Sequence, residues 1–309
     1  MRILLTGGTG FLGTNLTAVL DSHFGADNVT SIGGSLYDLR YAMDCRQVLF
    51  KYNPDVVIHA AGSVGGIGAN QENPGKFMYD NLIMGTNLIH AAHQATHKVS
   101  KFILLGTVCA YPKFTPVPFK EEELWNGYPE ETNAPYGIAK KTLMRLVEAY
   151  HEQYDFPGVN LIPVNMYGPY DHFNLTSSHV IPALILKVHQ AMRDGDPSIT
   201  LWGTGEASRE FLFAGDCGRA VVAAIKNDVT PEPINIGTGK EIKIKDLVAE
   251  IVDIMGYEGE VLYDSSKPDG QPRRCLDTSR AKERLGFEAE VDLREGLEQT
   301  IKWYLENHS

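Results

Sequence analysis

Short apolar runs alternate with longer amphipathic segments through about the first 240 residues of the chain. Runs with the composition of buried strands cover residues 3–5, 29–32, 56–58, 102–105, 159–164, 199–202 and 234–236. Helical periodicity covers residues 11–22, 81–95 and 136–154 between them. This alternation predicts an α/β fold, a doubly wound parallel sheet with helices on both faces.

The pattern changes in the last third of the chain. A short strand is expected at residues 261–263, and helices are expected at 180–192, 244–255 and 293–305, with turn residues between them. We therefore expect a Rossmann-like first domain at residues 1–170, to which segments around 205–240 return. Residues 171–309 should mainly form a smaller α/β domain.

A glycine-rich loop follows the first expected strand and opens the first expected helix. Gly8, Gly10 and Gly13 fit the spacing G-x-G-x-x-G. A glycine at the middle position lets backbone approach a pyrophosphate, which the helix N-terminus attracts. The sequence therefore predicts a dinucleotide site; its expected contact residues are Gly7, Gly8, Thr9, Gly10, Phe11, Leu12, Gly13 and Ala61.

The end of the second expected strand bears on which dinucleotide binds. An acidic residue usually stands there in NAD-binding proteins and holds the ribose 2′-hydroxyl. Here Ile32 is followed by Gly33-Gly34-Ser35, and the first carboxylate is Asp38. No arginine stands there to clamp a 2′-phosphate, but the missing repulsive carboxylate favours NADP(H) as the cofactor.

Four side chains of complementary chemistry occur in two nearby segments. If 107–109 continues the preceding strand, Thr107 and Cys109 share one face. Tyr136 and Lys140 are one helical turn apart and also share a face. We expect Thr107 to orient a carbonyl, Tyr136 to protonate its oxygen and Lys140 to lower the pKa of the phenol. Lys140 would also hold the nicotinamide ribose.

Five segments carry a resemblance to a known superfamily. They are Thr6-Gly7-Gly8-Thr9-Gly10-Phe11-Leu12-Gly13, His59-Ala60-Ala61-Gly62, Tyr136-x-x-x-Lys140, Asn165-Met166-Tyr167-Gly168-Pro169 and Ile234-Asn235-Ile236-Gly237. The chain resembles the extended short-chain dehydrogenases/reductases, which act on nucleotide sugars. Further segments resemble the branch that acts on GDP-linked 4-keto sugars: Ser63-Val64-Gly65-Gly66-Ile67, Cys109-Ala110-Tyr111-Pro112-Lys113, Ser178-His179-Val180-Ile181-Pro182, Arg209-Glu210-Phe211 and Lys267-Pro268-Asp269-Gly270.

The resemblance implies an enzyme that epimerises GDP-4-keto-6-deoxy-D-mannose at C3 and C5 and reduces it at C4 with NADPH. It implies Cys109 as the base and His179 as the acid. Candidate substrate-binding residues in the second domain and beside it are Asn165, Lys187, Trp202, Arg209 and Arg274. The cations among them would meet the diphosphate, where charge-assisted contacts are strong. A homodimer formed through helices 81–95 and 136–154 is also implied, although the apolar residues of 136–154 would serve equally to cover the sheet.

Other substrates of the same class stay open. The segment Tyr170-Asp171-His172-Phe173 stands where the family usually has His-Asp-Asn-Phe, close to the sugar. A paralogue acting on a GDP-4-keto heptose or 3,6-dideoxy sugar is the alternative. Sugar 4,6-dehydratases carry an acidic pair where this chain has Val108-Cys109. A non-catalytic dinucleotide sensor would have no need of Tyr136 and Lys140.

Bulk composition narrows the partners. The 309 residues carry 28 basic and 39 acidic side chains, a net charge of −11, which argues against binding to nucleic acid or an anionic membrane. No apolar run reaches the ~18 residues of a membrane span. The four cysteines form no paired motif, so we expect neither a metal site nor a disulfide framework. Unpaired cysteines also favour a cytoplasmic location.

Overall fold

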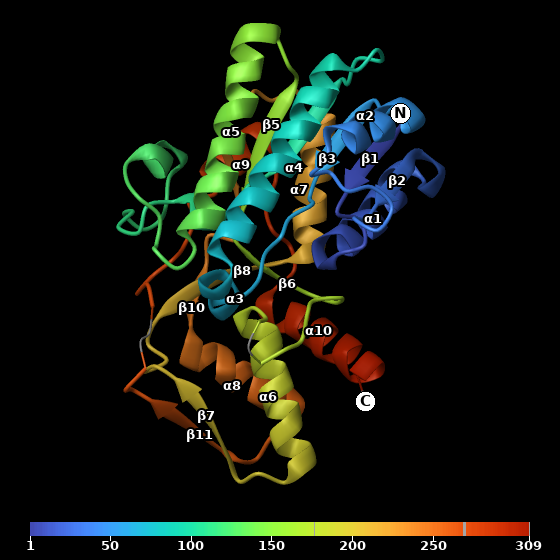
Figure 1. The fold of residues 1–309 in the computed structure, drawn as a ribbon. Helices are drawn as coiled ribbons and strands as arrows, with labels where there is room; N and C mark the ends of the chain where they lie inside the picture. The colour runs from blue at the N-terminus through green and yellow to red at the C-terminus, as the bar shows by residue number, and fades with distance from the viewer. Residues whose placement is uncertain (176, 268–269, 309) are drawn as a thin grey trace.

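The computed structural model describes residues 1–175, 177–267 and 270–308 (Figure 1). Its centre is a six-stranded parallel sheet in the order β2-β1-β3-β4-β5-β9. The strands are β1 (Ile3–Thr6), β2 (Val29–Ile32), β3 (Val56–His59), β4 (Lys101–Leu105), β5 (Gly158–Pro163) and β9 (Ile234–Ile236). The expected α/β fold class is confirmed. Strand order reverses between β1 and β3, where ligands of such sheets bind beyond the carboxyl ends of the strands.

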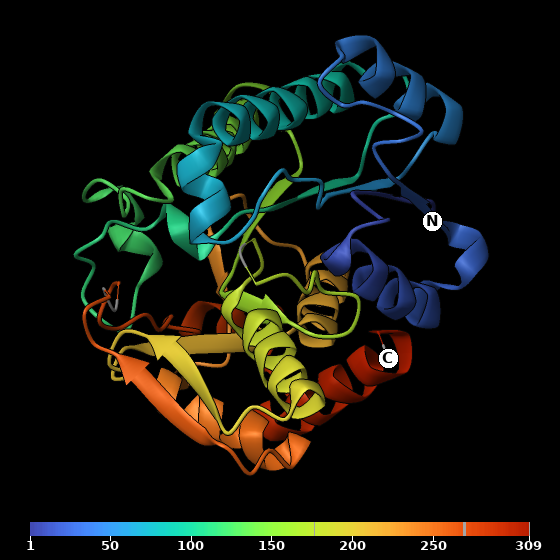
Figure 2. The ribbon, with the colours of Figure 1, turned by 60° about the horizontal axis from the view of Figure 1, so that its bottom comes forward.

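Helices cover both faces of this sheet (Figure 2). One face carries α1 (Phe11–Phe24) and α7 (Ala214–Lys226), which contact each other. The other face carries α2 (Ala42–Tyr52), α4 (Pro74–Gln94) and α5 (Ala134–Tyr154), packed in that order. Because both faces are covered, most residues of these strands are apolar.

Most of the remaining strands and helices form a second, smaller layer around an apolar core of their own. It holds a three-stranded sheet, β10-β8-β6, and a two-stranded sheet, β11-β7. Its strands are β6 (Asn165–Tyr167), β7 (Ser198–Trp202), β8 (Ser208–Phe213), β10 (Glu241–Lys243) and β11 (Glu260–Asp264). Its helices are α6 (Val180–Asp194), α8 (Ile244–Met255) and α10 (Leu293–His308), whereas α9 (Ser279–Leu285) packs against the first core.

Two expectations about the elements need correction. The run at 199–202 is a strand, but it pairs with β11 and lies outside the main sheet. Its alternating burial fits a sheet with one open face, unlike β1 of the main sheet, which is buried at every position. Helix α4 begins at Pro74 rather than at 81, because proline is tolerated in a first helical turn. The domain boundary near 170 stays a prediction, while α7 and β9 do return to the first layer.

Among the described residues, no helix is both long enough and apolar enough to cross a membrane.

A buried carboxylate links the second layer to the loops beside the main sheet. Glu210 on β8 is fully buried, and its oxygens accept N–H bonds from Thr238, Gly239 (2.8 Å) and Leu276 (2.6 Å). Burial raises the pKa of this carboxyl, and the three N–H donors oppose that rise. The neighbouring residue Arg209 and the chain leading to residue 276 are thereby fixed relative to each other.

Replacing this carboxylate by an amide should destabilise the fold. In Glu210→Gln, the side-chain NH2 faces backbone N–H groups that lose their acceptor, at a cost of about 2–3 kcal/mol. Urea unfolding measures the change in free energy. The control is Glu206→Gln, whose exposed carboxylate pairs with Lys243 and Lys245, and it should change stability by less than about 1 kcal/mol. Equal effects for the two variants would contradict the assignment.

Candidate active site

The end of β4 differs from the expected continuous strand. β4 ends at Leu105, and Val108–Ala110 form a 3-10 turn. Thr107 caps this turn, because its hydroxyl oxygen accepts the Cys109 N–H at 3.2 Å. The expectation that 107–109 extends the strand is therefore wrong, since a threonine oxygen competes with the sheet for backbone N–H groups. The turn still places Thr107 and Cys109 at the carboxyl end of the sheet.

The first turn of α5 packs directly against this 3-10 turn. A Cβ added to Gly137 would lie 2.3 Å from the Cys109 carbonyl oxygen, so only glycine allows the approach. Tyr136 is therefore held beside Thr107 and Cys109. Burial raises the pKa of the Tyr136 phenol, the nearby Cys109 raises it further, and a hydrogen bond with Thr107 lowers it.

Lys140 lies one turn further along α5 and is 3% exposed. Its ammonium donates to the Leu105 carbonyl at 3.2 Å, and burial lowers the pKa of Lys140 to about 8. We expected Lys140 to lower the pKa of the Tyr136 phenol; the structure corrects this, because burial dominates and the pKa is raised. The neutral phenol that results near pH 7 is a proton donor.

The glycine loop fits a dinucleotide. Gly7 has a φ of 76°, and a Cβ on Gly13 would lie 2.0 Å from the Gly7 oxygen, so the loop is tightly closed on itself. Helix α1 begins after Gly10 with no side-chain cap and no acidic residue in its first turn, which includes Phe11 and Leu12. An uncapped helix N-terminus without a repelling charge suits a pyrophosphate.

The turn after β2 lines the same loop. A Cβ on Gly33 would lie 2.4 Å from the Thr9 hydroxyl, whereas a Cβ on Gly34 would meet nothing within 4 Å. The backbone of Ala61, after β3, lies against Gly7 on the other side. These residues fit the adenosine half of NADP(H), with open space where the second strand ends.

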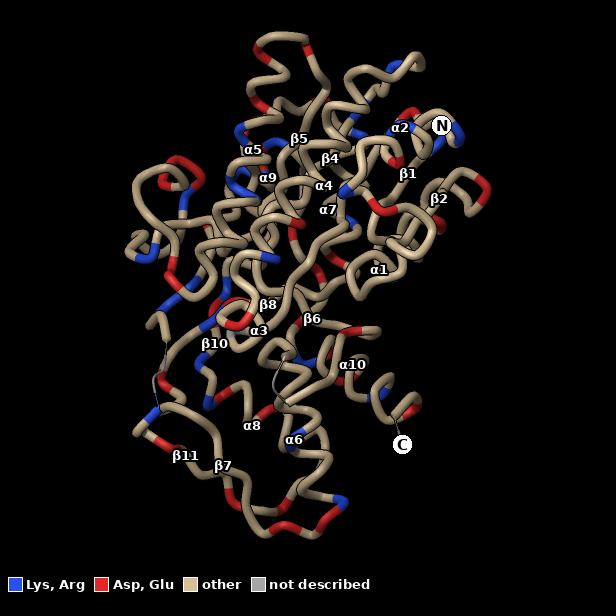
Figure 3. Tube along the Cα trace, viewed as in Figure 1, with Lys and Arg blue, Asp and Glu red and all other residues tan. Residues whose placement is uncertain are grey.

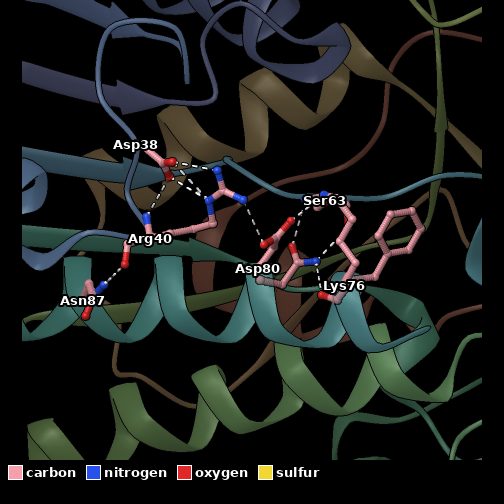
Figure 4. A network of polar contacts seen from close by, with 8 residues as sticks. Asp38, Arg40, Ser63, Lys76, Asp80 and Asn87 are labelled. Carbon is pink, nitrogen blue, oxygen red and sulfur yellow. Dashed lines mark hydrogen bonds and ion pairs between the residues drawn. The ribbon is translucent and has the colours of Figure 1, made fainter. Parts of the chain in front are cut away.

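The first arginine after β2 is already engaged. Arg40 pairs with Asp38 at 2.7 Å and with Asp80 at 3.4 Å (Figure 4). Lys76 binds the second oxygen of Asp80 at 2.6 Å and lies 3.4 Å from the Ser63 hydroxyl. This network fastens the loop after β2 to α4.

His179 is the N-cap residue of α6, and its imidazole is 47% exposed. The loop after β3 lies between it and Lys140. On one side, a Cβ on Gly62 would lie 3.8 Å from the Lys140 nitrogen. On the other, the Gly66 N–H donates to the Ser177 oxygen at 2.8 Å, two residues before His179. The imidazole nitrogen Nδ1 lies 4.0 Å from the Asp171 carboxylate.

Most of the expected substrate residues lie on strands and a helix of the second layer. Asn165 donates to the Glu210 carbonyl at 3.0 Å, and Lys187 donates to the Thr200 carbonyl. Trp202 is 76% exposed, with the Lys267 ammonium 5.7 Å from its ring. Arg209 donates to the Ser208 carbonyl at 2.7 Å. Basic segments lie around β8 and β10 in Figure 3.

Arg274 lies beside β8, because its carbonyl accepts the Glu210 N–H at 3.1 Å, and its Nη1 lies 3.7 Å from the Cys109 sulfur. The structure thus brings Thr107, Cys109, Tyr136, Lys140 and Arg274 together; Lys187 and Trp202 lie on the more distant α6 and β7. The roles of all these residues in binding and catalysis stay predictions.

Sequence reasoning missed several residues of this site. Gln271 gave no motif of its own, and Asp171 was noted only as part of the segment 170–173. His59 is fully buried, with Nδ1 at 2.9 Å from the Thr6 hydroxyl, Nε2 without a hydrogen bond to any described residue, and a pKa lowered to about 3 by burial. In the sequence, the burial of His59 is indicated only by its position at the end of an apolar strand.

The pKa of Lys140 predicts a stability change with pH. An unfolded lysine titrates near pH ~10.4, so between pH 8 and that value the unfolded state binds more protons than the folded state. The free energy of unfolding of the native chain, relative to Lys140→Met, should rise across this window by on the order of 3 kcal/mol. Denaturant unfolding at several pH values measures the difference. A flat difference would contradict a buried lysine with a depressed pKa.

Residues 3–237 match the NAD dependent epimerase/dehydratase family. Three curated relatives extend the likeness. GDP-L-fucose synthase of Escherichia coli (strain K12) is 42% identical over 82% of this chain and 81% of its own. Probable GDP-L-fucose synthase 1 of Oryza sativa subsp. japonica is 37% identical over 99% and 92%. GDP-L-colitose synthase of Yersinia pseudotuberculosis is 38% identical over 99% and 98%.

Two solved structures share the fold over nearly the whole chain. A GDP-L-fucose synthetase from Naegleria fowleri bound to NADP has a TM-score of 0.90 at 28% identity, covering 99% of this chain and 94% of that one. A GDP-6-OMe-4-keto-L-xylo-heptose reductase from C. jejuni has a TM-score of 0.91 at 25% identity, covering 99% and 98%. The chain therefore belongs to the NAD dependent epimerase/dehydratase family, within the extended short-chain dehydrogenases/reductases.

Proposed function

We propose that the protein epimerises GDP-4-keto-6-deoxy-D-mannose at C3 and C5 and then reduces it at C4 with NADPH to GDP-L-fucose. The observation that carries this proposal is the Cys109 thiol beside the Tyr136–Thr107 pair, because a reductase alone has no use for a second proton-transfer group there. The named relatives support the same substrate class.

Epimerisation follows from the acidity of carbons beside a ketone. Removing a proton from C3 or C5 gives an enolate whose charge lies on the C4 oxygen. Cys109 takes the proton from one face, and His179 returns a proton to the other face, which inverts the carbon. Thr107 and Tyr136 donate hydrogen bonds to the C4 oxygen and stabilise the enolate.

Reduction uses the same oxygen. Bound at the glycine loop, NADPH would supply the hydride for C4. The neutral Tyr136 phenol gives its proton to the oxygen, and Thr107 keeps the carbonyl in place. Lys140 is placed to hold the nicotinamide ribose and to restore the phenol's proton. The GDP moiety would lie along the second layer, with Lys187, Trp202 and Arg209 as contacts and Asn165 near the sugar.

A second candidate is the same chemistry on another GDP-4-keto sugar. The colitose and heptose enzymes among the similar proteins support this possibility. His172 adds a local observation, since its imidazole lies 3.2 Å from the Ser177 hydroxyl in the segment that leads to His179. A family asparagine at this position would present a different group to the sugar.

We also propose a cytoplasmic homodimer. Met78, Tyr79 and Tyr154 expose apolar surface on α4 and α5, whereas Leu143 and Val147 are buried against the sheet within one chain. All four cysteines are free thiols, which suits a reducing compartment. Sedimentation at micromolar concentration should give a dimer, and a monomer would contradict the proposal.

Isotope exchange tests the epimerisation. With GDP-4-keto-6-deoxy-D-mannose in D2O and no NADPH, deuterium should enter both C3 and C5. Cys109→Ser and His179→Asn should each lower exchange by roughly 10²-fold or more, since each removes a proton-transfer group. Both variants should still reduce a pre-epimerised substrate. Exchange at one carbon or none in the native enzyme would favour the second candidate.

Removing the phenol tests the reduction. Tyr136→Phe should lower the rate of NADPH oxidation by about 10²–10⁴-fold, because the C4 oxygen loses its proton donor. Tyr150→Phe is the matched control on the same helix; its hydroxyl lies 2.9 Å from His90 on the outer face, so its rate should stay near native. An active Tyr136→Phe enzyme would remove Tyr136 from the mechanism.

A further inference from the structure

Two charged side chains stand beside the proposed proton-transfer pair, and their charges are opposite. A guanidinium lies next to the thiol of Cys109, and a carboxylate lies next to the imidazole of His179. Neither the dinucleotide site at the glycine loop nor the Tyr136–Lys140 pair accounts for this guanidinium or this carboxylate. In the proposed epimerisation, the base starts as a thiolate, which a guanidinium suits, and the acid starts as an imidazolium, which a carboxylate suits.

The guanidinium of Arg274 is held in a fixed orientation. Its Nε and Nη2 both donate to the Gln271 side-chain oxygen, at 3.2 and 2.9 Å. The Gln271 nitrogen donates to the Lys113 carbonyl at 2.8 Å, which ties this pair to the loop after Cys109. The remaining nitrogen, Nη1, therefore points at the Cys109 sulfur at 3.7 Å. Such a contact is charge-assisted when the sulfur is a thiolate.

The carboxylate of Asp171 is nearly inaccessible, with 4% of its side chain exposed. Its Oδ1 accepts the His172 N–H at 2.7 Å and lies 4.0 Å from Nδ1 of His179. Its Oδ2 is buried without a hydrogen bond to any described residue. A buried carboxylate with one oxygen left without a hydrogen bond gains from a neighbouring positive charge. His179 caps the N-terminus of α6, which by itself disfavours an imidazolium, so the carboxylate opposes the helix dipole.

We infer that Arg274 and Asp171 are positioning residues that set the direction of proton transfer. Arg274 favours the thiolate of Cys109, and Asp171 favours the imidazolium of His179. The thiolate then takes the proton from carbon and becomes a thiol, while the imidazolium gives its Nδ1 or Nε2 proton to the opposite face and becomes neutral. Exchange with water restores both. This inference rests on the proposed epimerisation.

Other titratable groups near the pair do not supply these charges. Tyr136 faces Cys109, and burial keeps its phenol neutral. Lys140 lies behind Tyr136 at the Leu105 carbonyl. His172 is next to Asp171 and directs its ring to Ser177. The competing role for Arg274 is a contact with the GDP diphosphate, as expected from the sequence, and the experiment must separate the two.

The test measures each group without turnover. Iodoacetamide alkylation of Cys109, followed by peptide mass mapping against pH, reports the thiolate. In Arg274→Gln the alkylation rate at pH 7 should fall about tenfold, because the thiolate loses its charge-assisted contact. Arg273→Gln is the control, since its guanidinium pairs with Glu241 instead. The proton NMR signal of His179 reports the imidazole, and Asp171→Asn should change how that signal depends on pH.

The crossed measurements make the outcome specific. Asp171→Asn should leave alkylation unchanged, and Arg274→Gln should leave the imidazole titration unchanged. The pH profile of C3 and C5 deuterium exchange should shift up for Arg274→Gln, with recovery at high pH that a misfolded site would not show. GDP affinity, measured by calorimetry, should stay within about twofold of native in both variants.

Two results separate the inference from the proposed function. A native alkylation profile in Arg274→Gln together with weakened GDP binding overturns the inference and makes Arg274 a diphosphate ligand. A native imidazole titration in Asp171→Asn overturns the role of Asp171. If both shifts occur while the native enzyme exchanges no deuterium, the electrostatic assignment is upheld and the epimerase proposal fails.

Discussion

The close contact between the first turn of α5 and the 3-10 turn after β4 is the constraint on which the site depends. Gly137 permits it, because any Cβ there would run into the Cys109 carbonyl. The contact sets Tyr136 against Thr107 and Cys109 at the carboxyl end of the sheet. One helical turn later it sets Lys140 under the Leu105 carbonyl and beside the loop after β3. Reduction and proton transfer thereby share one location.

Burial then decides the protonation states of these groups. Desolvation raises the pKa of Tyr136 and lowers the pKa of Lys140 to about 8, so both neutral forms gain relative to water. A neutral phenol suits proton donation to a carbonyl oxygen during hydride transfer. The two groups proposed to transfer protons during epimerisation, Cys109 and His179, are more exposed than Lys140, and each has a charged side chain beside it.

Local patterns in the sequence predicted the features that depend on neighbouring residues. The glycine loop at 8–13 and the spacing of Tyr136 and Lys140 reflect single turns, so they could be read directly, as could the strands of the parallel sheet. The strand end after Leu105 could not, because it depends on the Thr107 hydroxyl capturing a backbone N–H. The proximity of Arg274 to Cys109 and of Asp171 to His179 could not be predicted for a similar reason: the partners lie far away in sequence or across a loop, and an isolated charge gives no periodic signal.

The most direct test of the shared site is a crystal structure with NADP+ and GDP-L-fucose bound. The account predicts the sugar C4 oxygen within hydrogen-bonding distance, about 2.6–3.2 Å, of the Tyr136 hydroxyl, with Thr107 as its second partner. Cys109 and His179 should face opposite sides of the sugar ring at C3 and C5. A C4 oxygen away from Tyr136, or both proton-transfer groups on one side of the ring, would contradict the account.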